Sequence, residues 1–396
     1  MPPAASVVST PRDDRKSAEI AAVNSRPNEG ARVAGSFAFA REILRSPDVR
    51  QGGAGADKIP VDNPEHISFF FLDGELHRKR RSAVANFFTP KAITTRYHPV
   101  MQRTMDRLIG QLQEVGSARL DELSFQMAVD VAADILGLTN SDSPMGLARR
   151  IRRLLNVGTA PRGGWLGARL QKMRMAFNAM VFWSKDLAPA IEARRTQPKD
   201  DVISYMIREN YSKQGMIIEC LTYGSAGMMT TREFIVMCAW HLFEKDELRR
   251  RFLEGGAADQ FAILEEILRL EPVAAMLHRR AATGIAETTG GPVQQGELIA
   301  IDIRLANTDE AIAGENPHVL DPDRAKRMKV VGSYLSFGDG PHRCPGSQVA
   351  LHETRIFLDR LLRVPGIRLA HEPDIIWNPA IQGYELRNSV VSCDRA

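Results

Sequence analysis

Cysteine is scarce in this chain, and paired cysteine spacing is missing altogether. The 396 residues contain four cysteines, Cys220, Cys238, Cys344 and Cys393, which are scattered along the sequence. This distribution argues against a disulfide framework and against a zinc ribbon, and it suits a reducing compartment. We therefore expect a cytoplasmic protein without disulfide bonds.

Long apolar runs and nucleotide-binding motifs are missing as well. No stretch approaches the roughly 18 consecutive apolar residues of a membrane span. Residues 1–30 are polar and lack the apolar centre of a signal peptide, so we expect a flexible arm there and a single domain over residues 31–396. There is no phosphate-binding glycine loop, dinucleotide fingerprint, zinc-protease motif or nucleophile elbow. The chain has 52 basic and 48 acidic residues, so its net charge gives little indication of the class of partner it binds.

Helical periodicity dominates what remains. The predicted helices cover residues 37–45, 74–88, 92–115, 122–138, 145–155, 171–195, 202–209, 215–243, 246–254, 258–270 and 347–362. The first should end at Ser46, because the following Pro47 disfavours helical backbone there. Strand signals gather after residue 275, with alternation over 298–303, a turn at 290–292 and a second small sheet around 375–391. We expect a mainly α, helix-rich domain with small β-sheets.

The most informative segment is residues 337–346, which read Phe-Gly-Asp-Gly-Pro-His-Arg-Cys-Pro-Gly. They place Cys344 in a glycine-rich turn at the start of a predicted helix, where amide N–H groups point at the sulfur and favour the thiolate. Gly338, Gly340 and Gly346 allow backbone to approach a bulky group where a Cβ atom would collide. A buried thiolate with donors aimed at it suits an axial metal ligand. The alternative is an inert buried cysteine near a turn.

This segment resembles the haem-binding loop of the cytochrome P-450 family, whose pattern is F-G-x-G-x-H-x-C-x-G. The resemblance extends over roughly residues 35–396 and is to the soluble bacterial type. It implies the P-450 fold and a haem b cofactor (iron protoporphyrin IX) whose iron is bound by Cys344, a thiolate ligand that favours O–O cleavage. Phe337, His342 and Gly346 are then cofactor-binding residues, and the implied enzyme is a monooxygenase that inserts one atom of O2 into its substrate.

A second motif pairs Glu266 with Arg269 on a predicted helix. Their three-residue spacing puts carboxylate and guanidinium on one face, although such pairs also occur by chance in many helices. The pair matches the E-x-x-R motif of the family, and Arg324 falls on the position of its third member. By resemblance, the three residues have a structural role and tie the cysteine loop to the helix.

A third motif covers residues 226–231, Ala-Gly-Met-Met-Thr-Thr. Small Ala226 and Gly227 leave space on one helix face, and Thr230 can hydrogen-bond a carbonyl one turn back and open the helix locally. Taken alone, this is an ordinary core helix with a threonine. It resembles the oxygen-activating A-G-x-[DE]-T-T segment of the family, which implies that Ala226 and Gly227 leave room for O2 and that Thr230 helps to deliver protons.

One residue departs from this third motif. Met229 stands where the family usually has an acid, and a thioether cannot relay a proton. Glu233, three residues beyond Thr230, is a candidate replacement, as are ordered water and the substrate itself. The departure keeps two alternatives open: a haem-thiolate catalyst of oxidative coupling, desaturation or a peroxide-driven reaction, and a haem-binding protein without turnover.

A fourth group of residues concerns the haem propionates. His77 and Arg81 lie four residues apart on a predicted helix and match the H-x-x-x-R pattern of the family. His342 and Arg280 fall on the other usual propionate positions, with Arg279 also possible. The alternative is that residues 77–81 form a solvated basic face or a nucleic-acid patch, but no nucleic-acid module surrounds them, so we expect no nucleic-acid partner.

The resemblance also indicates where substrate and redox partner bind. By position, the substrate pocket is lined by Phe69, Phe70, Met228, Met229, Met276, Leu277 and Ile381. This set favours a hydrophobic small-molecule substrate, although some of these side chains are expected to be simply core. Because the chain has no reductase-like extension, electrons must come from a separate ferredoxin or flavodoxin with its reductase. Candidates for a basic docking surface are Lys79, Arg80, Arg343, Arg355 and Arg360.

Overall fold

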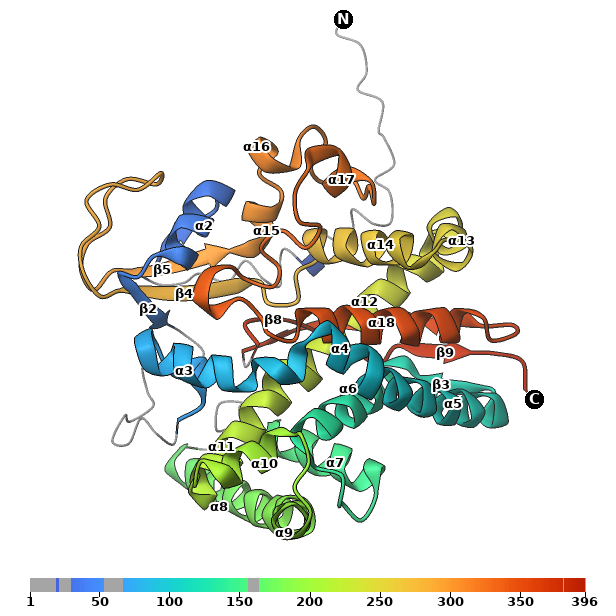
Figure 1. Cartoon of the computed structure of the whole chain (residues 1–396). Coiled ribbons are helices and arrows are strands. Elements are labelled where there is room, and N and C mark those ends of the chain that lie inside the picture. Colours follow the sequence, from blue (N-terminus) through green and yellow to red (C-terminus); the bar gives the residue numbers. More distant parts are fainter. Residues whose placement is uncertain (1–18, 21–29, 53–66, 156–163, 380, 396) are drawn as a thin grey trace, which may run out of the picture.

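A computed structural model describes residues 19–20, 30–52, 67–155, 164–379 and 381–395 of the chain (Figure 1). All but three residues of the predicted N-terminal arm lie outside these ranges. Within them, the structure is rich in helices with small sheets, as the sequence predicts. None of the helices in the described ranges is long and apolar enough to cross a bilayer.

The first half of the described chain contains these helices: α2 (Phe37–Arg45), η3 (Phe69–Phe71), α3 (Gly74–Val84), η4 (Ala85–Phe88), α4 (Pro90–Ala92), η5 (Ile93–Tyr97), α5 (His98–Val115), α6 (Leu120–Leu136), α7 (Pro144–Leu155), α8 (Gly164–Phe182), η7 (Trp183–Leu187) and α9 (Ala188–Thr196). The second half contains α10 (Val202–Arg208), α11 (Lys213–Tyr223), η8 (Gly224–Met229), α12 (Thr230–Glu244), α13 (Asp246–Glu254), α14 (Ala257–Leu270), α15 (Ile303–Asn307), α16 (Glu310–Ala313), α17 (Arg324–Met328), η9 (Gly340–His342) and α18 (Ser347–Leu362).

The strands form three small sheets. The largest has the order β1-β5-β4-β2, built from β1 (Arg32–Ala34), β5 (Leu298–Asp302), β4 (Met276–Ala281) and β2 (Val49–Gly52), with only the β1–β5 pair parallel. The second joins β3 (Ser117–Arg119), β9 (Val390–Ser392) and β6 (Arg368–His371). The third is the antiparallel pair β7 (Asp374–Asn378) and β8 (Gly383–Arg387).

Local signals fix several helix ends where the sequence predicts them. Helix α2 covers residues 37–45 as expected: the Ser36 hydroxyl caps its start, and Ser46 is extended with ψ of 132° ahead of Pro47. Helices α13 and α18 also match their predicted ranges. Gly116 ends α5 in the left-handed conformation, with φ of 82°, where glycine avoids the strain of a Cβ atom.

The main departure from prediction concerns the long helices. The predicted helices 92–115, 171–195 and 215–243 are each interrupted by a π-helical turn, at η5, η7 and η8. A π turn inserts one residue without changing composition, so the hydrophobic pattern does not reveal it. Strands β1, β2 and β3 were not predicted either, because each has only three or four residues and no clear alternation.

The core lies between the long helices, and it sets the frame of the site. Helix α12 packs against α6, α14 and α18, and Figure 1 shows α12, α14 and α18 together at the centre of the molecule. Trp240 and Phe357 are fully buried in this core. A second apolar cluster joins α2 to the four-stranded sheet at one side, through residues such as Phe39 and Ile299. The segment before α18 connects these two parts.

Candidate functional site

The loop that carries Cys344 is closed by its own backbone. The Cys344 amide donates to the Phe337 carbonyl at 2.8 Å. Asp339 accepts from the Gly340 amide at 2.8 Å and pairs with Arg45 of α2, also at 2.8 Å. Gly340 has φ of +65°, and a Cβ atom there would lie 2.3 Å from the Leu44 carbonyl oxygen. The close approach of α2 therefore requires glycine at this position.

The Cys344 sulfur lies at the start of α18, where the Gly346 and Ser347 amides donate toward it. Burial nevertheless raises the pKa of the thiol; these two amides and the charges of Arg81 and Arg343 only partly offset that effect. The two amides thus favour the thiolate, as the sequence predicts, while burial acts in the opposite direction and has the larger effect.

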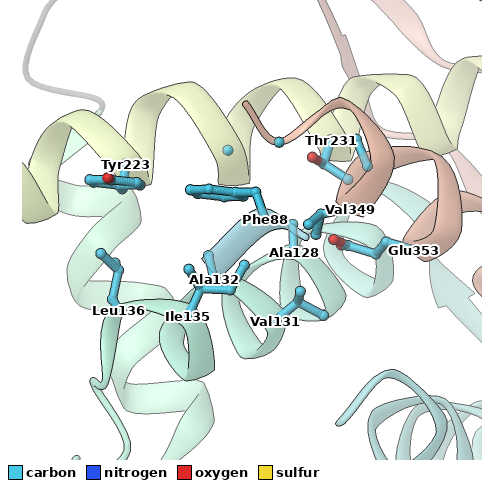
Figure 2. Close-up of a pocket in the computed structure, with 13 residues that line it drawn as sticks. Phe88, Ala128, Val131, Ala132, Ile135, Leu136, Tyr223, Thr231, Val349 and Glu353 are labelled. Carbon is cyan, nitrogen blue, oxygen red and sulfur yellow. The ribbon is translucent and has the colours of Figure 1, made fainter. Parts of the chain in front are cut away.

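A kinked helix faces this loop. The π turn η8 joins α11 to α12, and the Thr230 hydroxyl donates to the Ala226 carbonyl at 2.6 Å, as the sequence predicts. Ala226 and Gly227 are exposed on this turn. Figure 2 shows the cavity between α6, α11–α12 and α18, and its lining includes both Gly227 and Gly346. The cysteine loop and the kinked helix thus border one space.

Two histidines stack beside the loop. The His77 ring of α3 lies 4.0 Å from the His342 ring, centroid to centroid, with an angle of 28° between them. His342 Nε2 lies 3.0 Å from the Asp73 carboxylate, a partner that the sequence did not indicate. Burial lowers the pKa of His77 to about 4, with the charge of His342 as the next cause. His77 Nε2 is buried and has no hydrogen-bond partner among the described residues.

Arg279 completes this cluster, whereas Arg280 does not belong to it. Neighbouring residues of a strand point to opposite faces, and on β4 it is Arg279 that is buried, at 4% exposure. Burial lowers the pKa of its guanidinium to about 10, opposed by the charge of Asp73. Arg280 instead donates to the Gly296 carbonyl at the surface. The prediction of Arg280 as a cofactor-binding residue is therefore wrong.

The Glu266 triad is present and buried. Arg269 Nε lies 2.8 Å from Glu266 Oε2, and Arg324 Nε lies 3.2 Å from Glu266 Oε1. Asn307 connects the triad to the cysteine loop, because its side chain donates to the Arg269 carbonyl at 3.1 Å and accepts from the Leu335 amide at 2.9 Å. Leu335 stands two residues before Phe337, so the triad holds the base of the loop.

Comparison with known proteins agrees with this geometry. Residues 261–369 match the family model described as cytochrome P-450. Over 302 residues, the chain is 29% identical to the biotin biosynthesis cytochrome P-450 of Bacillus subtilis, covering 74% of this chain and 72% of that protein. It is also 26% identical to the steroid C26-monooxygenase of Mycolicibacterium smegmatis, covering 90% and 86%. The chain belongs to the cytochrome P-450 family. The fold agrees with that of CalO2, whose crystal structure superimposes with a TM-score of 0.77 at 22% identity and 96% coverage of both chains.

Membership of this family makes the protein a monooxygenase-type oxidoreductase and implies a haem cofactor. Two features of the site fit a propionate-bearing porphyrin. His77 Nε2 is a buried ring nitrogen without a partner, and Arg279 is a buried cation with no ion-pair partner in the described part of the chain. Both would gain a hydrogen bond from a carboxylate placed between them.

Glu233 was predicted as a proton relay, and the structure contradicts this role. Its side chain is fully buried, Oε1 accepts from Arg232 Nε at 2.6 Å, and Oε2 accepts from the Leu386 amide of β8 at 2.7 Å. Burial raises the pKa of Glu233 to about 7. Both oxygens are engaged, and the bond from Leu386 joins α12 to β8, so Glu233 is a structural residue in this P-450.

Several predicted pocket residues belong to the core. Met228 and Met229 are buried in the main apolar cluster, together with Ile381, and Met276 is buried in a small cluster with Ala300. This agrees with the expectation that some of these side chains are core, and burial does not exclude contact with an internal cavity, so their role as pocket lining stays a prediction.

The other three predicted pocket residues lie closer to the loop or to the surface. Phe69 contacts His77 with ring centroids 6.1 Å apart. Phe70 is 37% exposed, and Leu277 lies near Gly338 of the cysteine loop.

The predicted basic docking surface is smaller than expected. Arg80 is buried, donates to the Ile67 carbonyl and lies over the Tyr211 ring, so it does not form part of a surface. Arg355 is half-buried and Arg360 pairs with Asp106. Lys79 and Arg343 remain exposed.

Sequence reasoning did not show that two aromatic residues of the cavity lie together. Phe88 and Tyr223 stack with ring centroids 6.4 Å apart and an angle of 2°, and both line the cavity (Figure 2). They come from segments 135 residues apart in sequence, so no local pattern joins them.

Glu353 is another cavity residue to which the sequence analysis gave no role, although it did leave a signal in the sequence. It follows Val349 by four residues on the buried face of α18, where a charged residue is unusual.

Proposed function

We propose that this P-450 is a haem b monooxygenase that inserts one oxygen atom of O2 into a hydrophobic small molecule. The observation that carries the proposal is that Gly346 and Gly227 line the same cavity. Gly346 lies two residues after Cys344, and Gly227 lies three residues before Thr230. This arrangement supports a cofactor between the cysteine loop and the kinked helix, with its reacting face toward Ala226 and Gly227. Electrons would come from a separate ferredoxin or flavodoxin with its reductase.

The residues available to hold the haem come from four segments. Cys344 would bind the iron, and His77, Arg81, Arg279 and His342 would hold the propionates. Hydrogen bonds between cations and carboxylates of this kind contribute roughly 1.5–3 kcal/mol each when shielded from water. When bound, haem supplies the chemistry of O2 activation that a protein side chain lacks.

Thr230 would assist from the opposite side. Its hydroxyl donates to the Ala226 carbonyl at 2.6 Å, which leaves its oxygen lone pairs to accept from a water molecule on the exposed side of the turn. A water held in this way is placed to pass a proton. Thr230→Ala should therefore divert reducing equivalents to hydrogen peroxide; tight coupling in this variant would show that the relay avoids Thr230.

The character of the cavity supports a lipophilic substrate. Its walls are mostly apolar and aromatic, including Ala132, Ile135, Leu136 and Phe88 (Figure 2). One relative is named as a steroid C26-monooxygenase, and one structural neighbour was crystallised with an acyl carrier protein that carries hexadec-9Z-enoic acid. These two ligands suggest a panel of steroids and long-chain acyl compounds for spectral titration.

The ligand assignment can be tested by spectroscopy. Cys344→Ser should abolish the thiolate-type spectrum of the reduced carbon monoxide complex while wild-type protein shows it. An unchanged spectrum in the variant would refute the assignment of Cys344. Extraction of the cofactor with acidified solvent should release intact iron protoporphyrin IX, and a covalently retained porphyrin would refute haem b.

Met229 favours a second candidate function. Neither Met229 nor the fully engaged Glu233 can serve as the usual acid, so oxidative coupling, desaturation or a peroxide-driven reaction is the alternative. Product analysis with isotopically labelled dioxygen separates these cases, because coupling and desaturation leave no label in the product. A haem-binding protein without turnover would consume no reducing equivalents in the presence of substrate.

Lys79 and Arg343 suggest where a reductive partner docks. Both are exposed, and α3, which carries Lys79, contacts the cysteine loop where Arg81 donates to the Arg343 carbonyl. Complementary charge speeds association with an acidic partner. Lys79→Glu should slow ferredoxin-supported reduction most at low ionic strength, whereas Lys172→Glu on α8 should not. Reduction that ignores both the substitution and the salt concentration would refute this docking site.

A further inference from the structure

Helix α8 carries an unusual concentration of exposed apolar side chains. Of the 13 large apolar side chains that are exposed in the described part of the chain, six lie on this one helix: Trp165, Leu170, Met173, Met175, Phe177 and Met180. Among the α8 residues whose burial is described, only Phe182 at its end is buried. Single apolar residues on a surface need no explanation, but a contiguous patch of them marks an interaction site.

Four of these side chains form a stripe along the helix. Leu170, Met173, Phe177 and Met180 follow one another at spacings of three, four and three residues, the repeat with which a helix presents one face to a partner helix. Their exposed fractions lie between 59% and 65%. Helix α8 packs on α7, and Figure 1 shows α8 and α9 at the lower edge of the molecule. The α8 stripe, as we call these four residues, is therefore accessible to a partner.

The charge around the stripe has one sign. Helices α7 and α8 together contain seven Arg and Lys residues and no Asp or Glu, although the net charge of the whole chain is only +4. Arg150 pairs with Asp142 and Asp186. Arg152 pairs with Glu122. The other five basic residues are exposed and form no ion pair with the described residues: Arg149, Arg153, Arg169, Lys172 and Arg174.

Two of these five cations lie directly beside the stripe. Arg169 precedes Leu170, and Arg174 follows Met173. In paired helices, the charges that flank the apolar seam select the partner and its orientation. Acidic residues on a facing helix would pair with both arginines, whereas a second copy of α8 would place arginine against arginine in either orientation. The α8 stripe therefore fits an acidic helix and disfavours self-association.

The place of α8 separates it from the predicted site of the reductive partner. Helix α7, on which α8 packs, also contacts the kinked turn η8, where a Cβ atom on Gly224 would lie 3.9 Å from the Ile151 side chain. Lys79 and Arg343, the predicted docking residues for ferredoxin or flavodoxin, belong to α3 and to the cysteine loop instead. A partner on α8 would therefore lie one helix away from the kinked turn rather than beside the cysteine.

We propose that the α8 stripe is a docking surface for a helix of a partner protein, one whose own apolar stripe is flanked by Asp and Glu. This partner is distinct from the ferredoxin or flavodoxin that supplies electrons. The side chains present on α8 are of the types enriched in protein interfaces, which are aromatic residues, Met and Arg, and flexible Met lets such a surface adapt to its partner. Docking goes beyond the proposed monooxygenase function and can be measured without turnover.

The test uses two stapled helical peptides of equal length as probes. Both have Leu at the seam positions; one has Glu and the other Lys at the flanking positions. Fluorescence anisotropy of the labelled peptides measures their binding to the full-length holoenzyme. The Glu peptide should bind about tenfold more tightly than the Lys peptide, and the difference should shrink as the salt concentration rises.

Two variants test the two parts of the surface separately. Phe177→Ser should weaken binding of the Glu peptide about tenfold, because it removes an aromatic side chain from the seam. Val331→Ser is the matched control at an exposed apolar residue outside α8, and it should bind like wild type. The double variant Arg169→Glu with Arg174→Glu should transfer the preference to the Lys peptide. All of these residues are exposed, and an unchanged haem spectrum confirms that each variant is folded.

Each contrary result assigns the stripe elsewhere. Equal binding of the two peptides, or no transfer of preference in the double variant, would show a non-specific apolar surface and overturn the proposal. A wild-type dimer in sedimentation that Phe177→Ser converts to monomer would assign the stripe to a second copy. Binding to anionic lipid vesicles that Phe177→Ser abolishes, without a preference for the Glu peptide, would assign it to a membrane surface.

The reductive partner is the remaining alternative. If the double variant slows ferredoxin-supported reduction as strongly as Lys79→Glu does, the stripe belongs to the electron donor and the proposal is overturned. Peptide binding does not require product formation from O2. The monooxygenase proposal can therefore fail while docking on α8 stands, and the converse also holds.

Discussion

Glu353→Gln should change the pH dependence of stability. In the folded protein, burial raises the pKa of Glu353 from 4.5 to about 8. Below about pH 4.5 the folded and unfolded chains both carry the proton, so ionisation of Glu353 has no effect on stability. Between that pH and about pH 8 the unfolded chain releases the proton and the folded chain keeps it, so the free energy of unfolding falls as pH rises.

The size of this effect follows from the shift. One pKa unit corresponds to about 1.4 kcal/mol, so the wild-type protein should lose about 4 kcal/mol of stability from this group between about pH 5 and about pH 8. Glutamine has no proton to release in this range. The difference in unfolding free energy between Glu353→Gln and wild type should therefore grow by up to that amount, in favour of the variant at the higher pH.

Urea unfolding followed by circular dichroism at several pH values measures this difference directly. Comparing two proteins at each pH cancels the contributions of the other titrating groups that they share, including Asp130. Parallel stability profiles for the two proteins would refute the conclusion that Glu353 is buried with its proton.

Other predictions follow from the site. Arg279→Leu should speed the loss of haem to an acceptor globin, whereas Arg280→Leu should not; equal rates would contradict the placement of these side chains on opposite faces of β4. Glu266→Gln should cost about 3–5 kcal/mol in urea unfolding, because it leaves two buried arginines without their counter-charge; a stability loss that depends strongly on salt would point to an exposed triad instead. Gly340→Ala should lower haem incorporation and stability, because positive φ costs a side chain about 1–2 kcal/mol and the added Cβ atom meets the Leu44 carbonyl; an unaffected variant would show that α2 can move away.

What the sequence predicted correctly is mostly local. The ends of α2, α13 and α18 depend on caps and breakers within a few residues, and they match. The Glu266–Arg269 pair and the bond from Thr230 to Ala226 span three and four residues on one helix, and both are present. Interactions of this range are determined by helix geometry, so a single sequence contains the information.

The errors share a physical cause: the direction in which a side chain points depends on packing with distant segments. The sequence alone does not show which of the adjacent Arg279 and Arg280 is buried beside the cysteine loop, because this depends on which face of β4 is covered. Glu233 seemed close to Thr230 along the helix, but the amide of Leu386, 153 residues later, takes one of its oxygens. Asp130 of α6 raises the pKa of Glu353 of α18, and only the fold brings these two distant segments together.

The π turn η8 also restricts how the chain can vary in length. Its extra residue offsets α11 from α12, while Phe88 contacts one side of the turn at Tyr223 and β8 holds the other at Glu233. Removing one residue would rotate everything after the gap by about 100° relative to everything before it, and one of these two attachments would be lost. The segment can therefore exchange side chains more readily than it can gain or lose a residue, and functional proteins recovered from a library of single deletions at positions 224–229 would contradict this. An alignment that opens a gap in this segment would misplace either Thr230 or Tyr223, which stacks with Phe88.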